Sequence, residues 1–249
     1  AGGGLAPRGT PAAKAMLLPH GAWDDIGPVV VAGLRAASLH ETVVVLSANH
    51  SAHGPRAVVQ ADGVVDTMVG EIPIDAPLAE SLRALGGLTE SPMSLATEQG
   101  FATLLPFLAS AQPRLAVVPI ALHGVTAVAA ARVGVAIADA IVGRGGASTL
   151  VITTDLGHYG TQGDIASIGR AILEAFVALD TDALDAALGR AEQCQPTIEV
   201  CGAAPLLAGV HALRALGLTP RPALVPPMVT LLGPSADRRI GLGAAIIAG

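Results

Sequence analysis

The sequence has few aromatic side chains, few charged side chains and almost no cysteine. Aromatic residues make up 2% of the 249 residues and charged residues 14%, against roughly 25% charged in an average globular domain. So few rings argue against a platform that stacks single-stranded nucleic acid. A net charge of −6 also offers no basic footprint for a phosphate backbone, so we expect no nucleic-acid partner.

The chain also lacks a long uninterrupted apolar run, although 51% of its residues are hydrophobic. A membrane-spanning helix needs about 20 consecutive apolar residues. The best candidate, between Arg114 and Arg132, is interrupted by Pro119, His123 and Gly124. No cationic segment followed by an apolar stretch opens the chain. We therefore expect no secretory signal, no membrane partner and a cytoplasmic location.

The two cysteines are too few for a disulfide framework in a chain of this size. The spacing between Cys194 and Cys201 is not that of a zinc finger either. A reducing, cytoplasmic compartment is the simpler interpretation, and one local bridge between the two thiols stays open as an alternative.

Short β-branched apolar runs alternate with segments in which apolar residues recur every three or four positions. The predicted strands are Ala15–Leu18, Thr42–Leu46, Ala57–Gln60, Leu115–Ile120, Thr149–Thr153, Ala223–Leu232 and Ile240–Ile247. The predicted helices are Ile26–Ser38, Pro77–Leu85, Thr97–Ala109, Thr126–Val142, Ile165–Ala178, Thr181–Leu188 and Gly202–Leu216. This alternation is typical of an α/β domain with a mainly parallel or mixed sheet and helices on both faces.

The same pattern predicts the domain organisation. We expect a flexible segment over residues 1–14 and a single domain over residues 15–249. Within it, Asp66–Ile74 is expected to form an inserted β excursion that pairs with Ala57–Gln60.

Four of the seven histidines directly follow predicted strands. They are His20, His50, His123 and His158. In an open α/β sheet, ligands gather beyond the carboxyl ends of the strands. Because histidine is the commonest metal ligand and the usual general base near neutral pH, these positions predict a metal or acid–base site at that edge.

The third metal ligand is not set by spacing. Two histidines and one anionic ligand form the set of non-haem Fe(II) oxygenases and of catalytic zinc. Asp155, Glu98 and Cys201 all compete for the third place. Cys201 lies at the expected start of a helix, where backbone N–H groups favour a thiolate, whereas Asp155 and Glu98 are also explained as helix caps. Trp23 is either a core anchor or a wall of the site.

An ordered series of short motifs resembles the Memo family. The matching segments are Pro19-His20-Gly21-Ala22-Trp23, Ser47-Ala48-Asn49-His50, Val69–Asp75, Glu98-Gln99-Gly100, Leu105-Pro106-Phe107-Leu108, Thr153–Tyr159 and Cys201-Gly202. They occur in the family's order from about Leu17 to the C-terminus. Gln99 stands where the family has histidine and Trp23 where it has tyrosine, which leaves the substrate class open.

The resemblance implies the α/β fold of class III extradiol ring-cleavage dioxygenases, with a metal pocket at one edge. It implies His20, His50 and Cys201 as metal ligands, and it places Asp155 and His158 in the same pocket. Fe(II) is the expected metal, with copper or zinc as alternatives, because a thiolate makes the site softer than a carboxylate would.

These observations predict a metal-dependent, dioxygenase-like oxidoreductase that acts on an unknown small molecule with O2. His158, steered by Asp155, is expected to move protons, and Trp23, Glu98 and His123 are expected further pocket residues. Two alternatives stay open. One is a non-catalytic module that binds redox metal or docks a peptide, and the other is a zinc hydrolase with Asp155 or His158 as base.

Overall fold

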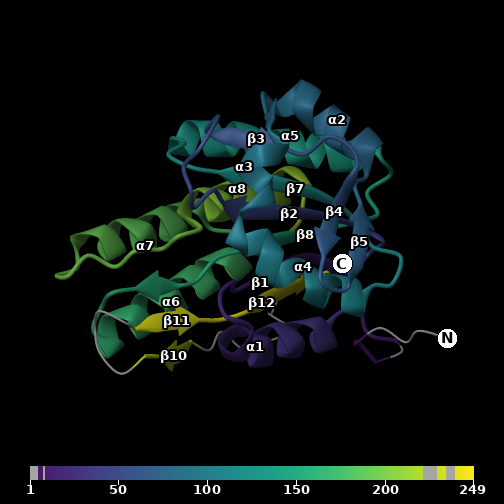
Figure 1. Cartoon of the computed structure of the whole chain (residues 1–249). Coiled ribbons are helices and arrows are strands. Elements are labelled where there is room, and N and C mark those ends of the chain that lie inside the picture. The colour runs from purple at the N-terminus through teal and green to yellow at the C-terminus, as the bar shows by residue number, and fades with distance from the viewer. Residues whose placement is uncertain (1–4, 8, 221–228, 234–238) are drawn as a thin grey trace.

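The computed structural model describes residues 5–7, 9–220, 229–233 and 239–249. Its centre is a seven-stranded sheet in the order β12-β1-β8-β2-β7-β3-β6 (Figure 1). The strands are β1 (Ala13–Leu18), β2 (Thr42–Ala48), β3 (Ala57–Val59), β6 (Thr89–Glu90), β7 (Ala116–Leu122), β8 (Ser148–Thr153) and β12 (Ala245–Ala248). The four central strands β1, β8, β2 and β7 are parallel, whereas β12 and β3 run antiparallel to their neighbours β1 and β7. The predicted α/β class with a mainly parallel or mixed sheet is confirmed.

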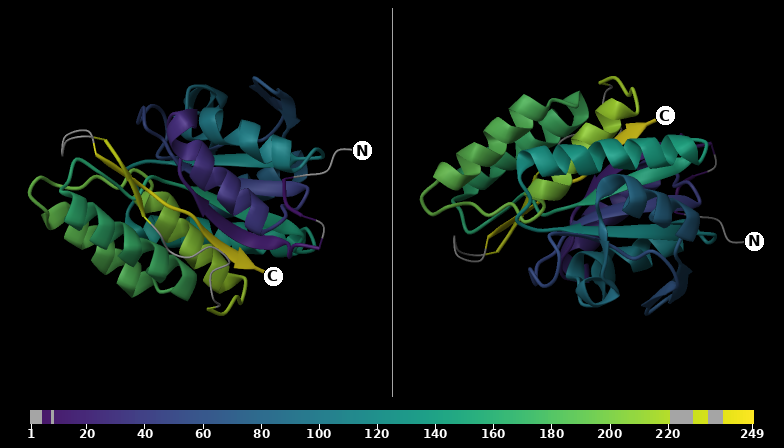
Figure 2. Two further views of the ribbon diagram at one scale, coloured as in Figure 1. Left: turned by 90° about the horizontal axis from the view of Figure 1, so that it is seen from below. Right: turned by 90° about the horizontal axis from the view of Figure 1, so that it is seen from above.

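Helices cover both faces of this sheet (Figure 2). On one face α1 (Trp23–Ala36) packs on β1 and α4 (Gln99–Ala111) packs on β2. On the other face α8 (Ala203–Ala215) packs on β2 and β8 and is covered by α5 (Ala127–Gly143). Because both faces are covered, every residue of β8 is buried, which explains the continuous apolar runs in the sequence.

The remaining helices lie around this core. They are α2 (Ala76–Gly86), α3 (Pro92–Ala96), α6 (Gln162–Ala178) and α7 (Thr181–Gln193). Helix α2 packs on α5, α3 packs on β3, and α6 and α7 form a pair beside the sheet. Among the described residues no helix combines the length and the apolar character that crossing a membrane requires.

The prediction of one strand over Ile240–Ile247 is wrong. The segment forms two strands that belong to different sheets, β11 (Ile240–Leu242) and β12. β11 pairs with β9 (Gly157–His158) and β10 (Thr230–Leu232), while β12 joins β1, so the ladder breaks at Gly243 and Ala244. β10 matches the end of the predicted strand Ala223–Leu232, and residues 223–228 lie outside the described residues.

The pairing expected for the β excursion is also wrong. β4 (Val64–Thr67) and β5 (Gly70–Pro73) form a separate two-stranded hairpin, and β3 pairs with β7 and β6 instead. The helix predicted over Thr97–Ala109 is α4, which begins two residues later because Thr97 is the C-cap of α3 and Glu98 the N-cap of α4. β1 begins at Ala13, two residues before the predicted strand.

Asp75 fixes the start of α2. It lies at the edge of the sheet opposite the carboxyl ends of β1, β2 and β8. Its Oδ1 accepts the backbone N–H of Leu78 at 3.1 Å, which caps the helix. Its two carboxylate oxygens also accept bonds from Nη2 of Arg144 at 2.8 and 2.7 Å. Through these bonds the buried carboxylate links the start of α2 to Arg144, the C-cap residue of α5.

Candidate metal centre

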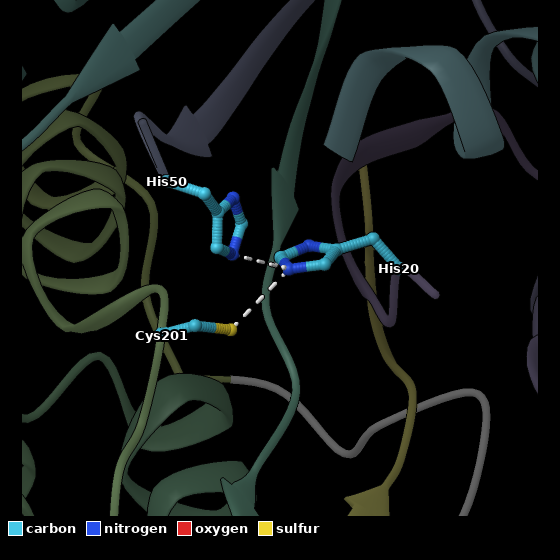
Figure 3. A group of neighbouring side chains, drawn as sticks. All are labelled: His20, His50 and Cys201. Carbon is cyan, nitrogen blue, oxygen red and sulfur yellow. Dashed lines mark hydrogen bonds between the residues drawn. The ribbon is translucent and has the colours of Figure 1, made fainter. Parts of the chain in front are cut away.

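The parallel strands β1, β2 and β8 bring three loops together at one edge of the sheet. His20 follows β1, His50 follows β2, and Asp155 follows β8. Cys201 comes from the turn that leads into α8. Figure 3 shows the side chains of His20, His50 and Cys201 pointing toward one another.

The donor atoms of these three residues converge on one point. Nε2 of His20 lies 3.2 Å from Nε2 of His50 and 3.3 Å from Sγ of Cys201. All three atoms lie within 4.8 Å of one another. One ion with ligand bonds of roughly 2.0–2.3 Å can therefore contact all three.

The far side of each imidazole is held by an oxygen. Nδ1 of His20 is 2.9 Å from Oγ1 of Thr153, and Nδ1 of His50 is 2.6 Å from Oε1 of Glu98. When each Nδ1–H donates to its oxygen, both Nε2 atoms carry lone pairs that face each other and the sulfur. Such an arrangement of donors is unfavourable unless a cation lies between them, so the residues fit a metal ion.

Glu98 supports His50, one of the candidate ligands. Its side chain is buried and also accepts the backbone N–H groups of His50 at 2.8 Å and of Gly100 at 2.9 Å. Burial alone would raise the pKa of this carboxyl, but the hydrogen bonds from His50 and Gly100 outweigh it and lower the pKa. Within the described residues the potential ligand atoms form two groups, one of His20, His50 and Cys201 and one of Asp155, His158 and Cys201, and Glu98 is in neither. It is both the cap of α4 and the partner of His50.

The surroundings of Cys201 favour its thiolate form. Its Sγ accepts the backbone N–H of Asp155 at 3.3 Å. Burial would raise the pKa of this thiol, but hydrogen bonds from His158, His20 and His50 outweigh it and bring the pKa well below its ordinary value. The same interactions, led by the bond to Cys201 and followed by the bond to Glu98, raise the pKa of His50 to about 10.

Asp155 and His158 form a second pair beside the thiolate. Oδ2 of Asp155 is 3.2 Å from Nε2 of His158, and Oδ1 of Asp155 accepts the backbone N–H of His20 at 3.2 Å. Burial would lower the pKa of His158, but the hydrogen bonds with Asp155 and Cys201 outweigh it and raise the pKa to about 10. Asp155 does not cap α6, since Thr161 does so. Potential ligand atoms of Asp155, His158 and Cys201 lie within 4.8 Å of one another, so these residues form a second group that could hold a metal ion.

A cleft of about 610 Å³ reaches the centre from α7 and α8, and His50 and Cys201 line it. His123 also lines it, and the buried Nδ1 of this residue has no hydrogen-bond partner in the described part of the chain. Trp23 does not line this cleft. It borders a neighbouring cavity of about 470 Å³ beside β4, and its Nε1 donates to the carbonyl of Thr103 at 3.0 Å.

Several residues of this site carry no signal in the sequence. The sequence pattern marks Thr153 only as the end of a strand, and it does not single out three acidic residues of the cleft. The acidic residues are Asp185, Glu192 and Glu199. Asp185 and Glu192 lie at exposed positions of a helix, where carboxylates are ordinary, so no local pattern marks them as part of a site.

Comparison with known proteins agrees with the motifs. The model of the family described as "Memo-like protein" matches residues 4–225. A MEMO1 family protein of Caldivirga maquilingensis is 24% identical over 208 residues, which cover 82% of this chain and 72% of that protein. A MEMO1 family protein of Methanothermobacter thermautotrophicus is 26% identical over 210 residues, covering 83% and 74%.

Similarity to a solved structure extends the agreement to the fold. The crystal structure of the uncharacterized protein JW3007 from Escherichia coli K12 superposes with a TM-score of 0.57 and 16% identity. The match covers 94% of this chain and 99% of that chain. At this level of identity the likeness concerns the fold alone.

Proposed function

Because this chain belongs to the Memo-like family, we propose that it is a metal-dependent oxidoreductase whose ion is held by His20, His50 and Cys201. The observation that carries the proposal is the convergence of two imidazole nitrogens and a thiolate on one point, with each imidazole held from behind by an oxygen. A set of two nitrogens and one sulfur suits Fe(II), copper and zinc. Fe(II) is the proposed resident ion because the family resembles iron-dependent ring-cleavage dioxygenases.

A bound Fe(II) would supply a coordination site for O2 and for a chelating small molecule. The residues of the chain do the rest. Glu98 and Thr153 orient the two imidazoles, and the backbone N–H of Asp155 holds the thiolate in place. The cleft beside His50 and Cys201 admits the small molecule.

His158 is the proposed general acid and base. The carboxylate of Asp155 orients its ring and stabilises the protonated form, which lets His158 hold a proton close to Cys201. Asp155 also accepts the backbone N–H of His20, so the same carboxylate orders the loop of one metal ligand.

Metal content tests the ligand set. The protein is purified without oxygen, loaded with Fe(II), and compared with the His20→Ala, His50→Ala and Cys201→Ala variants. His53→Ala is the matched control, because His53 lies in the same exposed loop as His50 and is in neither group of potential ligands within the described ranges. We expect a single ion per chain in the wild type and the control, and background metal in the two histidine variants. Full occupancy in both histidine variants would contradict the ligand set.

Oxygen uptake tests the reaction class. We expect the Fe(II) protein to consume O2 in the presence of catechols and the zinc protein to be inactive. Tight metal binding without turnover across a broad panel of small molecules would instead support a binding module. Activity of the zinc protein without oxygen would support a hydrolase.

A further inference from the structure

The cleft that reaches His50 and Cys201 has an acidic wall. Asp185 and Glu192 are seven residues apart on α7, so they lie about two turns apart on the same face of the helix, with Leu188 between them. Glu199, in the segment between α7 and α8, adds a third carboxylate. All three side chains are exposed, and they concentrate negative charge at the entrance.

Within the described part of the chain, the basic side chains that line the cleft are two histidines, His50 and His123. Neither lysine nor arginine lines the cleft, and none of the three carboxylates forms an ion pair among the described residues. Arg190 of the same helix borders a different hollow, beside α6. Arg56 donates to the carbonyl of Gly124 at the rim and does not line the cleft.

The rest of the cleft is apolar. Its apolar lining consists of Leu122, Val125, Ala127, Leu188, Ala203, Ala204 and Leu207. Walls of low dielectric constant concentrate the field of the carboxylates inside a cleft.

We propose that the substrate of this site is a small organic cation, with an ammonium group held by the wall of Asp185, Glu192 and Glu199. Its apolar body lies against α8, and its coordinating group points toward His50 and Cys201. A volume of about 610 Å³ suits a small molecule, because ligand sites span roughly 300–1,000 Å³. The preference for a cation follows from the residues that line the cleft. The role of the coordinating group rests on the metal centre proposed above.

Two pairs of probes with similar shape and opposite charge test the proposal by isothermal titration. Dopamine and dihydrocaffeate are titrated into the Fe(II)-loaded protein without oxygen. Phenethylamine and phenylpropanoate, which lack the catechol, are titrated into the metal-free protein at millimolar concentrations. We expect the amine to bind roughly tenfold more tightly than the acid in each pair, and the preference to shrink at high salt.

The carboxylates are tested by the double variant Asp185→Asn/Glu192→Gln. It should reduce the preference to less than about threefold, since each exposed charge contributes modestly. Glu174→Gln is the matched control, because it removes one exposed carboxylate of α6 that borders the hollow away from the cleft. The control should keep the full preference.

Equal affinities for the amine and the acid in the wild type would overturn the proposal, as would a preference that survives in the double variant. Because phenethylamine and phenylpropanoate are titrated into the metal-free protein, their relative affinities do not depend on the metal centre. If the protein binds no metal but prefers phenethylamine, the cationic cleft stands and the proposed function fails. If metal binds and neither amine is preferred, the proposed function stands and the cationic cleft fails.

Discussion

Nδ1 of His50 lies 2.6 Å from Oε1 of Glu98, and Oε2 of the same carboxylate accepts the backbone N–H of His50 at 2.8 Å. The carboxylate thus fixes the ring and the loop of one proposed metal ligand together. A carboxylate behind a ligating imidazole sets its tautomer and raises its basicity. Glu98 is therefore the residue through which helix α4 acts on the metal centre.

Replacing Glu98 with glutamine should weaken metal binding without removing a ligand. The neutral amide cannot stabilise His50 as the carboxylate does, so we expect the affinity for Fe(II) or Co(II) to fall by about 10–100-fold. Competition with a chelator of known affinity measures the change. Glu90→Gln, at an exposed position of β6, is the control and should leave the affinity unchanged. An unaltered affinity in Glu98→Gln would show that the hydrogen bond does not support the centre.

Metal affinity should keep rising with pH beyond the range in which an ordinary histidine loses its proton. The pKa of His50 is raised to about 10, so near neutral pH its imidazole carries a proton that a metal must displace. The lowered pKa of Cys201 favours the thiolate that binds a metal. We expect affinity to increase steadily from about pH 6 to pH 9, and to be lost in acid. Titrations at a series of pH values check this. A plateau above about pH 7 would contradict the raised pKa.

His158→Ala should keep the metal and lose turnover. His158 belongs with Asp155 to the second potential group and not to that of His20, His50 and Cys201, so its removal leaves the proposed ligand set intact. Loss of a general acid and base typically costs about 10²–10⁴-fold in rate. Metal content and oxygen uptake are measured on the same sample. Lost metal would make His158 a ligand, and full turnover would leave it without a catalytic role.

Asp75→Asn should destabilise the fold at neutral pH. Burial would raise the pKa of Asp75, but hydrogen bonds from Arg144, Leu78 and Thr42 outweigh it and lower the pKa. A lowered folded pKa contributes stability above the unfolded value of about 3.9, and that stability is lost as pH falls through the folded pKa. We expect a loss of about 1–3 kcal/mol at pH 7 by urea unfolding, shrinking toward pH 3.

The control for Asp75→Asn is Asp139→Asn, an exposed carboxylate of α5. It should change stability by less than about 0.5 kcal/mol. A difference between wild type and Asp75→Asn that stays constant down to pH 3 would show that the charge of Asp75 is not responsible.

Two glycines of α5 should respond in opposite ways to alanine. A Cβ at Gly134 would press on the carbonyl oxygen of Ala208 in α8, whereas a Cβ at Gly143 would meet nothing within 4 Å. Gly134→Ala should cost about 1–3 kcal/mol through overpacking, and Gly143→Ala should be neutral or add up to about 1 kcal/mol. Urea unfolding of both variants measures the contrast. Equal effects would mean that α5 and α8 can separate without cost.

Much of the sheet could be predicted because strands covered on both faces leave continuous apolar runs. The strands β1, β2 and β8 are of this kind, and the loops that follow their carboxyl ends carry His20, His50 and Asp155. The order of strands along the sheet does not follow from such runs. Short elements such as β9 show no periodicity, and the division between β11 and β12 depends on pairing with distant strands.

The third ligand illustrates the limit of local patterns. Glu98 and Cys201 both precede a helix, and nothing within either segment ranks one above the other. The distinction comes from tertiary structure, since Sγ of Cys201 reaches Nε2 of His20 while the carboxylate of Glu98 reaches Nδ1 of His50. Family resemblance supplied the ranking that spacing did not.

The position of β1 between β8 and β12 has a consequence for biosynthesis. A ribosome makes the chain from its N-terminus, so β1 and its histidine emerge long before either neighbouring strand exists. His20 cannot take its place until β8 has been translated, and its partner Cys201 appears later still. The topology therefore dictates an order: the three donor atoms can converge only after β8 and Cys201 have both been translated.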